Sequence, residues 1–224
     1  MEGCIMRSVQ HSPHYDANYF SWQKTIGDFG GWANLDKFKA YIAQHHDVLD
    51  FGCGGGYLLK RIDCHKRIGI EPNPSAAIVA QQNGVEVYTN ANGVPDSCAD
   101  VVISNNALEH TLNPLDEIKS LMPKIRDGGQ VVFFVPCESI SLAYIPNDIN
   151  HHLYSWSPMC LGNLFTEAGY RVIESKPYVY KWPPHYQFIA NLGGRRLFNM
   201  ACWLYGRIER SWFQVRLVAV KPSS

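Results

Sequence analysis

The chain has 224 residues, of which 46% are hydrophobic and 18% charged, and it carries 20 basic and 20 acidic side chains. These proportions are ordinary for a globular protein, and the length is enough for one α/β domain with a core of its own. A net charge of zero argues against a dedicated nucleic-acid binder, because such proteins carry a large basic excess. We therefore expect no nucleic-acid partner.

Seven cysteines are spread along the chain without a C-x-x-C pair, so neither a zinc ribbon nor a thioredoxin-like site is expected. Reduced thiols in a cytosolic protein are the simpler interpretation. The first residues, MEGCIMRSVQHSPHYD, lack the apolar core of a signal peptide. No segment has the length of a membrane span. These observations predict a cytoplasmic protein without a transmembrane segment.

Hydrophobic periodicity predicts strands and helices that alternate from residue 34 onward. The first element is a helix over 34–45 that buries Leu35, Phe38, Tyr41 and Ile42. Further helices are expected, in chain order, at 56–62, 75–84, 114–129 and 157–170. Strands are expected at the short apolar runs 48–51, 67–72, 85–89, 99–105, 130–136, 171–181 and 213–222.

This alternation predicts an α/β fold, a Rossmann-like, doubly wound, seven-stranded and mostly parallel sheet with helices on both faces. No ordinary crossover helix joins the last two strands, so we expect the last strand to be antiparallel. We interpret residues 1–224 as a single domain. It would comprise an N-terminal lid or helix at 1–44, a ligand-binding core at 45–181 and a helical insertion at 182–212 before the last strand.

Four glycines cluster where the first strand passes to the next element, in HDVLDFGCGGGYLL at 46–59. Ligands of open α/β sheets bind at such strand ends, where glycine lets the backbone approach a ligand closely. The pattern is Asp50-x-Gly52-x-Gly54-x-Gly56. It fits neither the G-x-G-x-x-G dinucleotide fingerprint nor a G-x-x-x-x-G-K-[ST] phosphate loop.

The pattern resembles the first motif of class I S-adenosylmethionine (SAM) dependent methyltransferases, in particular small-molecule members with a type 11/23-like methyltransferase domain. Later segments resemble the family's following motifs, in the same order: IGIEP, TNANGVPDSCADVVISNNALEH, DGGQVVFFVP and NHHLYSWSPMCLGNLFTEAGYRV. The resemblance covers about residues 15 to 180. It implies that 45–181 is a SAM-binding core and that S-adenosylhomocysteine is the product.

The resemblance also implies roles for individual residues in holding SAM. Asp50 would face the ammonium group, and Glu71 would accept hydrogen bonds from both ribose hydroxyls. The remaining candidates would line the methionine part, the ribose or the adenine: Gly52, Cys53, Gly54, Gly56, Pro72, Asn73, Asn90, Ala91 and Asn105. Cys53 is expected only as a small residue in the loop, and Asn90 stands where the family often has Asp. Structural alternatives are that Asp50 caps the turn and that Glu71 is a solvated strand-end acid.

An aromatic segment near the N-terminus, HYDANYFSWQ, is similar to one that folds over SAM in related family members. Tyr19 is its candidate for cofactor contact, together with Tyr15, Phe20 and Trp22. Aromatic side chains suit a lid because they exclude water. The alternative is that they pack as part of an ordinary terminal helix.

Methyl transfer needs a general base only when the acceptor is a hydroxyl or a protonated amine. The candidate catalytic residues are His110, His151, His152 and Tyr154, with Glu138 nearby. For His110 the alternative is a structural hydrogen bond, and for the two adjacent histidines it is capping, packing or solvation. No metal site is expected, because no nearby acid completes a convincing ligand set with His151 and His152.

The segment from Trp182 to Ser211 departs from the family pattern, in which a short turn joins the last two strands. Helical spacing predicts that Leu197, Ala201, Leu204 and Ile208 face the core. A second face combines Trp203 with Arg196, Arg207 and Arg210. It would contact an anionic acceptor, a membrane surface through 195–210 or a second subunit, or it would simply be a solvated face.

The sequence therefore predicts a SAM-dependent methyltransferase acting on a small molecule such as a sugar or a lipid-linked or anionic acceptor. The alternatives are a protein or RNA methyltransferase and a SAM-binding module without catalysis. Against RNA stands the absence of a [DNS]-P-P-[YFW] element after the fourth strand, where the chain reads SNNALEH. A nicotinamide-dependent oxidoreductase is disfavoured by the failed glycine spacing.

Overall fold

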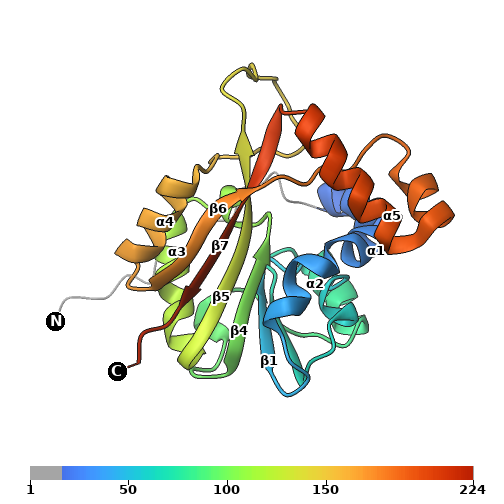
Figure 1. Cartoon of the computed structure of the whole chain (residues 1–224). Coiled ribbons are helices and arrows are strands. Elements are labelled where there is room, and N and C mark those ends of the chain that lie inside the picture. Colours follow the sequence, from blue (N-terminus) through green and yellow to red (C-terminus); the bar gives the residue numbers. More distant parts are fainter. Residues whose placement is uncertain (1–16, 224) are drawn as a thin grey trace.

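The chain folds around one mixed β-sheet (Figure 1). The structure, a computed structural model, describes residues 17–223, with side chains from residue 24 on. Its strands are β1 Asp47–Phe51, β2 Lys66–Ile70, β3 Glu86–Tyr88, β4 Ala99–Asn105, β5 Ile125–Glu138, β6 Arg171–Tyr178 and β7 Trp212–Val220. Their order in the sheet is β3-β2-β1-β4-β5-β7-β6, and β7 runs antiparallel to both of its neighbours. The predicted fold class is confirmed.

Helices cover both faces of the sheet, as the strand–helix alternation requires (Figure 1). The helices are α1 Ala17–Phe38, α2 Pro74–Gln82, α3 Pro114–Leu121, α4 Pro158–Glu167 and α5 Tyr186–Ile208. On one face, Phe38 of α1 and Ala80 of α2 pack with the buried side chains of β1, β4 and β5. On the other face, Ile118 of α3 and Phe165 of α4 do the same. Burial of this apolar surface is the main stabilising contribution.

A third, smaller core joins α5 to α1 beyond the carboxyl ends of the strands. Phe198 of α5 is fully buried, and its ring lies 5.5 Å from Phe29 and 5.3 Å from Trp32 between centroids. Trp182 and Tyr186 complete the aromatic cluster around Phe29. The insertion at 182–212 therefore covers the end of the sheet where the glycine loop lies. No helix among the described residues combines the length and apolarity needed to cross a bilayer.

The predicted first helix was wrong in its position. The helix begins by Ala17 and ends at Phe38, and only a single 3-10 turn, Lys39–Tyr41, follows before the chain becomes extended at Ile42. Glycines at 27, 30 and 31 lower helix propensity and concealed the true start. Two of them are needed for packing: a Cβ added at Gly27 would lie 2.3 Å from the Tyr57 ring, and one at Gly31 would lie 2.2 Å from the Tyr57 carbonyl oxygen.

Three other helical predictions were also wrong in detail. In the predicted helix 114–129, α3 ends at Leu121 and residues 125–129 belong to β5. Residues 56–62 form a loop with only the 3-10 turn Leu59–Arg61, and the Arg67 guanidinium donates to the carbonyls of Leu59 and Ile62. In α5, Leu204 is 48% and Ile208 80% exposed, although both were expected in the core. Non-helical dihedral angles at Gly193 and Gly194 kink α5. Beyond the kink, the buried positions are Phe198, Cys202 and Gly206.

Candidate active site

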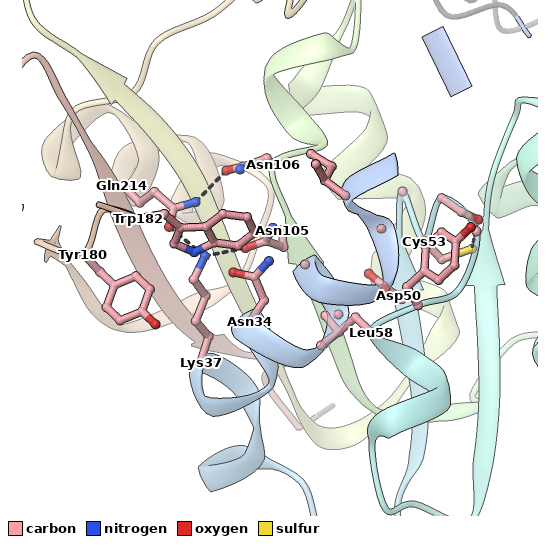
Figure 2. Close-up of a pocket in the computed structure, with 18 of the residues that line it drawn as sticks. Asn34, Lys37, Asp50, Cys53, Leu58, Asn105, Asn106, Tyr180, Trp182 and Gln214 are labelled. Atoms are coloured by element: carbon pink, nitrogen blue, oxygen red, sulfur yellow. Dashed lines mark hydrogen bonds between the residues drawn. The ribbon is translucent and has the colours of Figure 1, made fainter. Parts of the chain in front are cut away.

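A cavity of about 440 Å³ opens between the glycine loop, α1 and the segment that precedes α5. Its floor includes Asp50, Gly52 and Gly54, its α1 side includes Asn34 and Lys37, and its outer wall includes Trp182 and Trp212. Figure 2 shows Asn34 and Lys37 of α1 near Trp182 on one side of the view, with Asp50 and Cys53 of the glycine-loop region on the other. The volume is in the range of small-molecule and cofactor sites.

The glycine loop takes a backbone course that only glycine adopts without strain. Gly52, Gly54 and Gly56 have positive φ angles of 77°, 53° and 69°. A Cβ at Gly52 would lie 2.3 Å from the Ala107 Cβ. The loop is tied to the neighbouring strand because the N–H groups of Gly52 and Cys53 donate to the Ile70 carbonyl, at 3.0 and 3.1 Å.

Glu71 joins the loop to the end of β2. Its two carboxylate oxygens accept hydrogen bonds from the Gly54 N–H and the Asn73 N–H, each at 2.8 Å. Burial raises the pKa of Glu71, while these two hydrogen bonds favour the ionised form. Because each oxygen retains lone-pair capacity, the carboxylate still has acceptor sites for ligand hydroxyls. Glu71 stands beside the cavity-lining loop rather than in the lining itself.

Asp50 lies at the carboxyl end of β1 and lines the cavity, although it is only 3% exposed. Burial raises the pKa of Asp50 to about 8, and the charge of Glu71 adds to the rise. A cationic ligand group beside Asp50 would reverse this shift by favouring the carboxylate. The site therefore suits a ligand with a positive charge at this point, as SAM has.

The other predicted cofactor residues fall into two groups. Cys53 and Asn105 line the cavity together with Gly52 and Gly54. Pro72, Asn90 and Ala91 are absent from its lining, and the Asn90 side chain accepts a hydrogen bond from the Asn92 N–H at 3.0 Å. Gly56 lies within the loop, where its N–H donates to the Cys53 carbonyl at 2.9 Å. The side chain of Tyr19 lies outside the part of the chain that is described, with those of Tyr15, Phe20 and Trp22.

A buried polar network that the sequence reasoning missed forms one wall of the cavity. Lys37 donates to Asn105 Oδ1 at 2.8 Å and to Gln214 Oε1 at 2.7 Å, and Gln214 in turn donates to Asn106 Oδ1 at 2.7 Å (Figure 2). Burial lowers the pKa of Lys37 to about 7. A polar residue amid the apolar run WFQVRLVAV was the available signal for Gln214. Lys37 gave no comparable signal, because it reads as an ordinary helix lysine.

His110 and His152 come together beyond the ends of β4 and β5, with their ring centroids 5.1 Å apart. The Nδ1 of His152 is 2.7 Å from Glu138 Oε1, and the Nε2 of His110 is 3.8 Å from Glu109 Oε1. None of these residues lines the cavity itself, but Glu138 pairs in register with Trp212, which does. The four residues Glu109, His110, Glu138 and His152 are called the histidine cluster below.

The other two candidate catalytic residues make contacts outside this cluster. His151 is exposed, and its backbone N–H donates to Asp148 Oδ2 at 3.1 Å. The Tyr154 hydroxyl donates to the Leu112 carbonyl at 3.0 Å, and its ring stacks on Trp156. The expectation that His151 and His152 lack a nearby acid was wrong for His152, because Glu109 and Glu138 both lie close to it. Glu109 was missed because a backbone turn, invisible to spacing rules, brings its side chain inward.

A family model described as a methyltransferase domain matches residues 28–175. This segment contains the glycine loop, Glu71 and the turn that carries Glu109 and His110. The chain belongs to the class I SAM-dependent methyltransferases. SAM is the cofactor of that family, and the cavity, the glycine loop and the two acids Asp50 and Glu71 fit it. The contacts of individual residues with SAM stay predictions.

Two groups of relatives share part of the sequence. The chain is 30% identical over 114 residues to a tRNA U34 carboxymethyltransferase of Shewanella oneidensis, which covers 43% of this chain and 34% of the relative. It is 28% identical over 138 residues to a ubiquinone biosynthesis O-methyltransferase of Cronobacter sakazakii, with 53% and 57% covered. The chain thus spans about a third and somewhat more than half of these relatives' lengths.

Solved structures share the fold at low sequence identity. A SAM-dependent methyltransferase of Thermotoga maritima, described as a possible histamine N-methyltransferase, aligns with a TM-score of 0.65 and 15% identity over 93% of this chain and 97% of that one. A [4+2]-cyclase aligns with a TM-score of 0.61 and 16% identity over 98% and 89%. These likenesses concern the fold alone, and the cyclase illustrates that this fold carries other reactions.

Proposed function

We propose that the chain is an enzyme that transfers a methyl group from SAM to a hydroxyl oxygen of a small molecule. The observation that carries the proposal is the histidine cluster beside a cavity bounded by the glycine loop. Such imidazole and carboxylate groups serve to remove or position a hydroxyl proton. SAM supplies a methyl group that its sulfonium charge already activates.

Different residues would bind SAM and act on the acceptor, on two sides of the cavity. On the cofactor side, Asp50 would hold the ammonium and Glu71 the ribose hydroxyls, while Gly52 and Gly54 leave room for the ligand against the backbone. On the acceptor side, His110 and His152 would act on the hydroxyl, and we assign no catalytic role to His151 or Tyr154. Holding both reactants in line accounts for most of the rate in such displacements, with effective molarities of roughly 10⁵–10⁸ M.

A small acceptor is favoured over RNA by the charge balance and by the walls of the cavity. The chain has 20 basic and 20 acidic side chains. The outer wall combines Tyr180, Trp182 and Trp212 with a single lysine, Lys181, and does not form a basic groove. Aromatic walls suit a flat or apolar acceptor. The tRNA-modifying relatives match over only about a third of their length. Their similarity does not decide the acceptor, so the test below includes tRNA.

The test supplies SAM with a labelled methyl group and follows the label into small phenols, catechols, sugars or unmodified tRNA. We expect label in a hydroxylated small molecule. His152→Gln should lower kcat about 10²-fold with the affinity for S-adenosylhomocysteine unchanged. His65→Gln is the matched control, because His65 is an exposed histidine that also contacts an acid, Asp47, away from the cavity. Label that enters tRNA alone would contradict the proposal.

A further inference from the structure

We propose that Glu109, His110 and His152 bind one divalent transition-metal cation such as Mn²⁺, Co²⁺ or Zn²⁺. Each of the three offers a ligand atom, and these atoms all lie within 4.8 Å of one another. Two come from the turn Leu108–His110 after β4, and the third comes from the segment after β5. Imidazole nitrogens with a carboxylate form a ligand set suited to these metals.

Glu109 supplies an independent reason to place a cation here. Its side chain is 0% exposed, and neither carboxylate oxygen has a hydrogen bond to another described residue. A buried carboxylate without a hydrogen bond, whose nearest basic group is His110 at 3.8 Å, is costly, and a bound cation would offset that cost. Burial raises the pKa of Glu109, and the charge of Lys37 opposes this rise. Lys37 nevertheless donates its hydrogen bonds to Asn105 and Gln214 and not to Glu109.

Glu138 prepares His152 for metal binding. A carboxylate only accepts hydrogen bonds, so the 2.7 Å contact with Glu138 Oε1 makes His152 Nδ1 the protonated nitrogen. The lone pair then resides on Nε2, which is the nitrogen available to a metal. A carboxylate that holds the second nitrogen of a ligating histidine is the usual outer contact of metal sites, and its loss weakens metal affinity about 10–100-fold.

The use of the cation rests on the proposed function, whereas its binding does not. With the ion bound, His110 and His152 would act on the hydroxyl through the metal and not as direct bases. A hydroxyl bound to a divalent cation is acidified and releases its proton to solvent. The resulting oxygen would form a bond to the methyl carbon as the carbon–sulfur bond breaks, and the electron pair of that bond would remain on sulfur. The products are the methyl ether and S-adenosylhomocysteine.

The test measures metal binding without any acceptor. Protein treated with a chelator is titrated with MnCl₂ by calorimetry and with CoCl₂ by visible absorption. We expect one ion per chain, a loss of at least 10-fold in affinity for Glu109→Gln and His152→Gln, and a loss of about 10–100-fold for Glu138→Gln. His65→Gln and Glu86→Gln are matched controls from the other end of the sheet and should bind as wild type does.

Two results would overturn the metal site: no binding by the folded protein, or binding that the three cluster variants leave unchanged. Glu138 is exposed, so Glu138→Gln keeps the test decisive even where Glu109→Gln fails to fold. Metal binding at the cluster without methyl transfer to any hydroxyl would refute the proposed function and leave the metal site standing. A rate of methyl transfer that a chelator leaves unchanged would refute the catalytic use of the ion.

A separate observation concerns the outside of α5. Beyond the kink, Met200, Trp203, Leu204 and Ile208 form an exposed stripe, and Phe188 and Leu192 are exposed before it. The loop after β5 exposes another group of large side chains, Ile140, Leu142, Tyr144, Ile145 and Ile149. Its first residue, Ser139, donates to the Ser211 carbonyl at 2.8 Å, so the loop starts beside the end of α5. Figure 1 shows both at the same end of the sheet.

We infer that this outer surface of α5 and the 139–150 loop binds an anionic lipid bilayer. Arg196, Arg207 and Arg210 are exposed alongside the apolar stripe, and the Arg207 guanidinium lies over the Trp203 ring. The nearby acid Glu209 is paired with Lys181. The 139–150 loop adds one acid, Asp148, so the three arginines leave the surface with a net positive charge. An apolar stripe with cationic flanks and a tryptophan is the pattern of helices that lie in a membrane interface.

Flotation with vesicles tests this surface. We expect the protein to float with phosphatidylcholine vesicles that contain phosphatidylglycerol, and about 10-fold less with phosphatidylcholine alone. Leu204→Ser with Ile208→Ser should abolish flotation, whereas Ile78→Ser, a matched exposed position on α2, should not. The absence of flotation would contradict bilayer binding and indicate a solvated face. A dimer in light scattering that the double variant disrupts would contradict it in favour of a second copy of the chain.

Discussion

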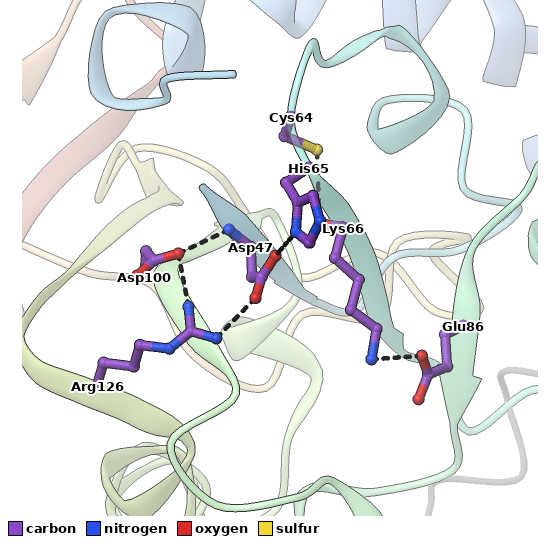
Figure 3. Close-up of polar contacts among 7 residues, drawn as sticks. All are labelled: Asp47, Cys64, His65, Lys66, Glu86, Asp100 and Arg126. Carbon is purple, nitrogen blue, oxygen red and sulfur yellow. Dashed lines mark hydrogen bonds and ion pairs between the residues drawn. The ribbon is translucent and has the colours of Figure 1, made fainter. Parts of the chain in front are cut away.

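The charged residues at the two ends of the sheet differ in their surroundings: those at one end are ion-paired, and those at the other are buried. At the amino ends of the strands, Asp47 contacts Arg126 at 2.7 Å and His65 at 2.6 Å, Asp100 contacts Arg126 at 2.6 Å, and Lys66 contacts Glu86 at 2.7 Å (Figure 3). Hydrogen bonds from these partners outweigh burial and lower the pKa of Asp47. Each of these five charged side chains and His65 has an oppositely charged or acidic partner beside it.

At the carboxyl ends, burial dominates. Burial raises the pKa of both Asp50 and Glu109 to about 8 and lowers that of Lys37 to about 7. Buried groups with strongly shifted pKa values cluster at functional sites. The contrast shows that the ion-paired residues at the amino end balance one another's charges without a ligand. The carboxyl end is arranged for the charges of ligands, and the predictions below test that division from the largest expected effect to the smallest.

The largest effect is expected from a side chain at the first glycine of the loop. Gly52→Val should destabilise the fold by about 3 kcal/mol or more and abolish S-adenosylhomocysteine binding, because it combines a φ of 77° with a 2.3 Å contact to Ala107. Gly128→Val is the control, since Gly128 has a φ of 75° and open space around it. It should cost about 1–2 kcal/mol and leave binding intact, as urea unfolding and calorimetry will report.

A smaller effect of opposite sign is expected at Asp50. Its folded-state pKa of about 8 lies above the unfolded value, so the folded state binds more protons, and stability falls as pH rises from about 4 to 8. Asp50→Asn removes this loss and should raise the melting temperature at pH 7 by about 2–4 °C or more. It should also weaken S-adenosylhomocysteine binding. An unchanged pH dependence between 5 and 8 would refute the account of Asp50.

The smallest effect is expected at the amino end. Arg126→Met removes two partly exposed ion pairs and should cost about 1 kcal/mol, without any change in ligand affinity. The pKa of Asp47 is lowered in the folded state, so its contribution is present above the unfolded pKa and is lost as pH falls through the folded value. The variant should therefore lose less stability than wild type on acidification from pH 5 to 2, as thermal melts will show.

The sequence predicted the glycine loop better than the polar wall of the cavity and the histidine cluster. Strand positions and the glycine loop follow from local patterns, because a buried strand needs a run of apolar residues and a positive φ favours glycine. Lys37 and Gln214 meet across 177 positions, and Glu109 turns inward only through tertiary packing, so neither was predicted. The exposed Leu204 and Ile208 were misplaced because the kink at Gly193 and Gly194 resets which face of α5 is inward.

The central claim is tested most directly by one pair of glutamate variants at opposite ends of the sheet. S-adenosylhomocysteine is titrated calorimetrically into wild type, Glu71→Ala and Glu86→Ala, with NADH as a control ligand. The account predicts micromolar binding of S-adenosylhomocysteine alone, weakened at least 10-fold by Glu71→Ala and unchanged by Glu86→Ala. Equal affinities in all three proteins, or no binding by folded wild type, would contradict it.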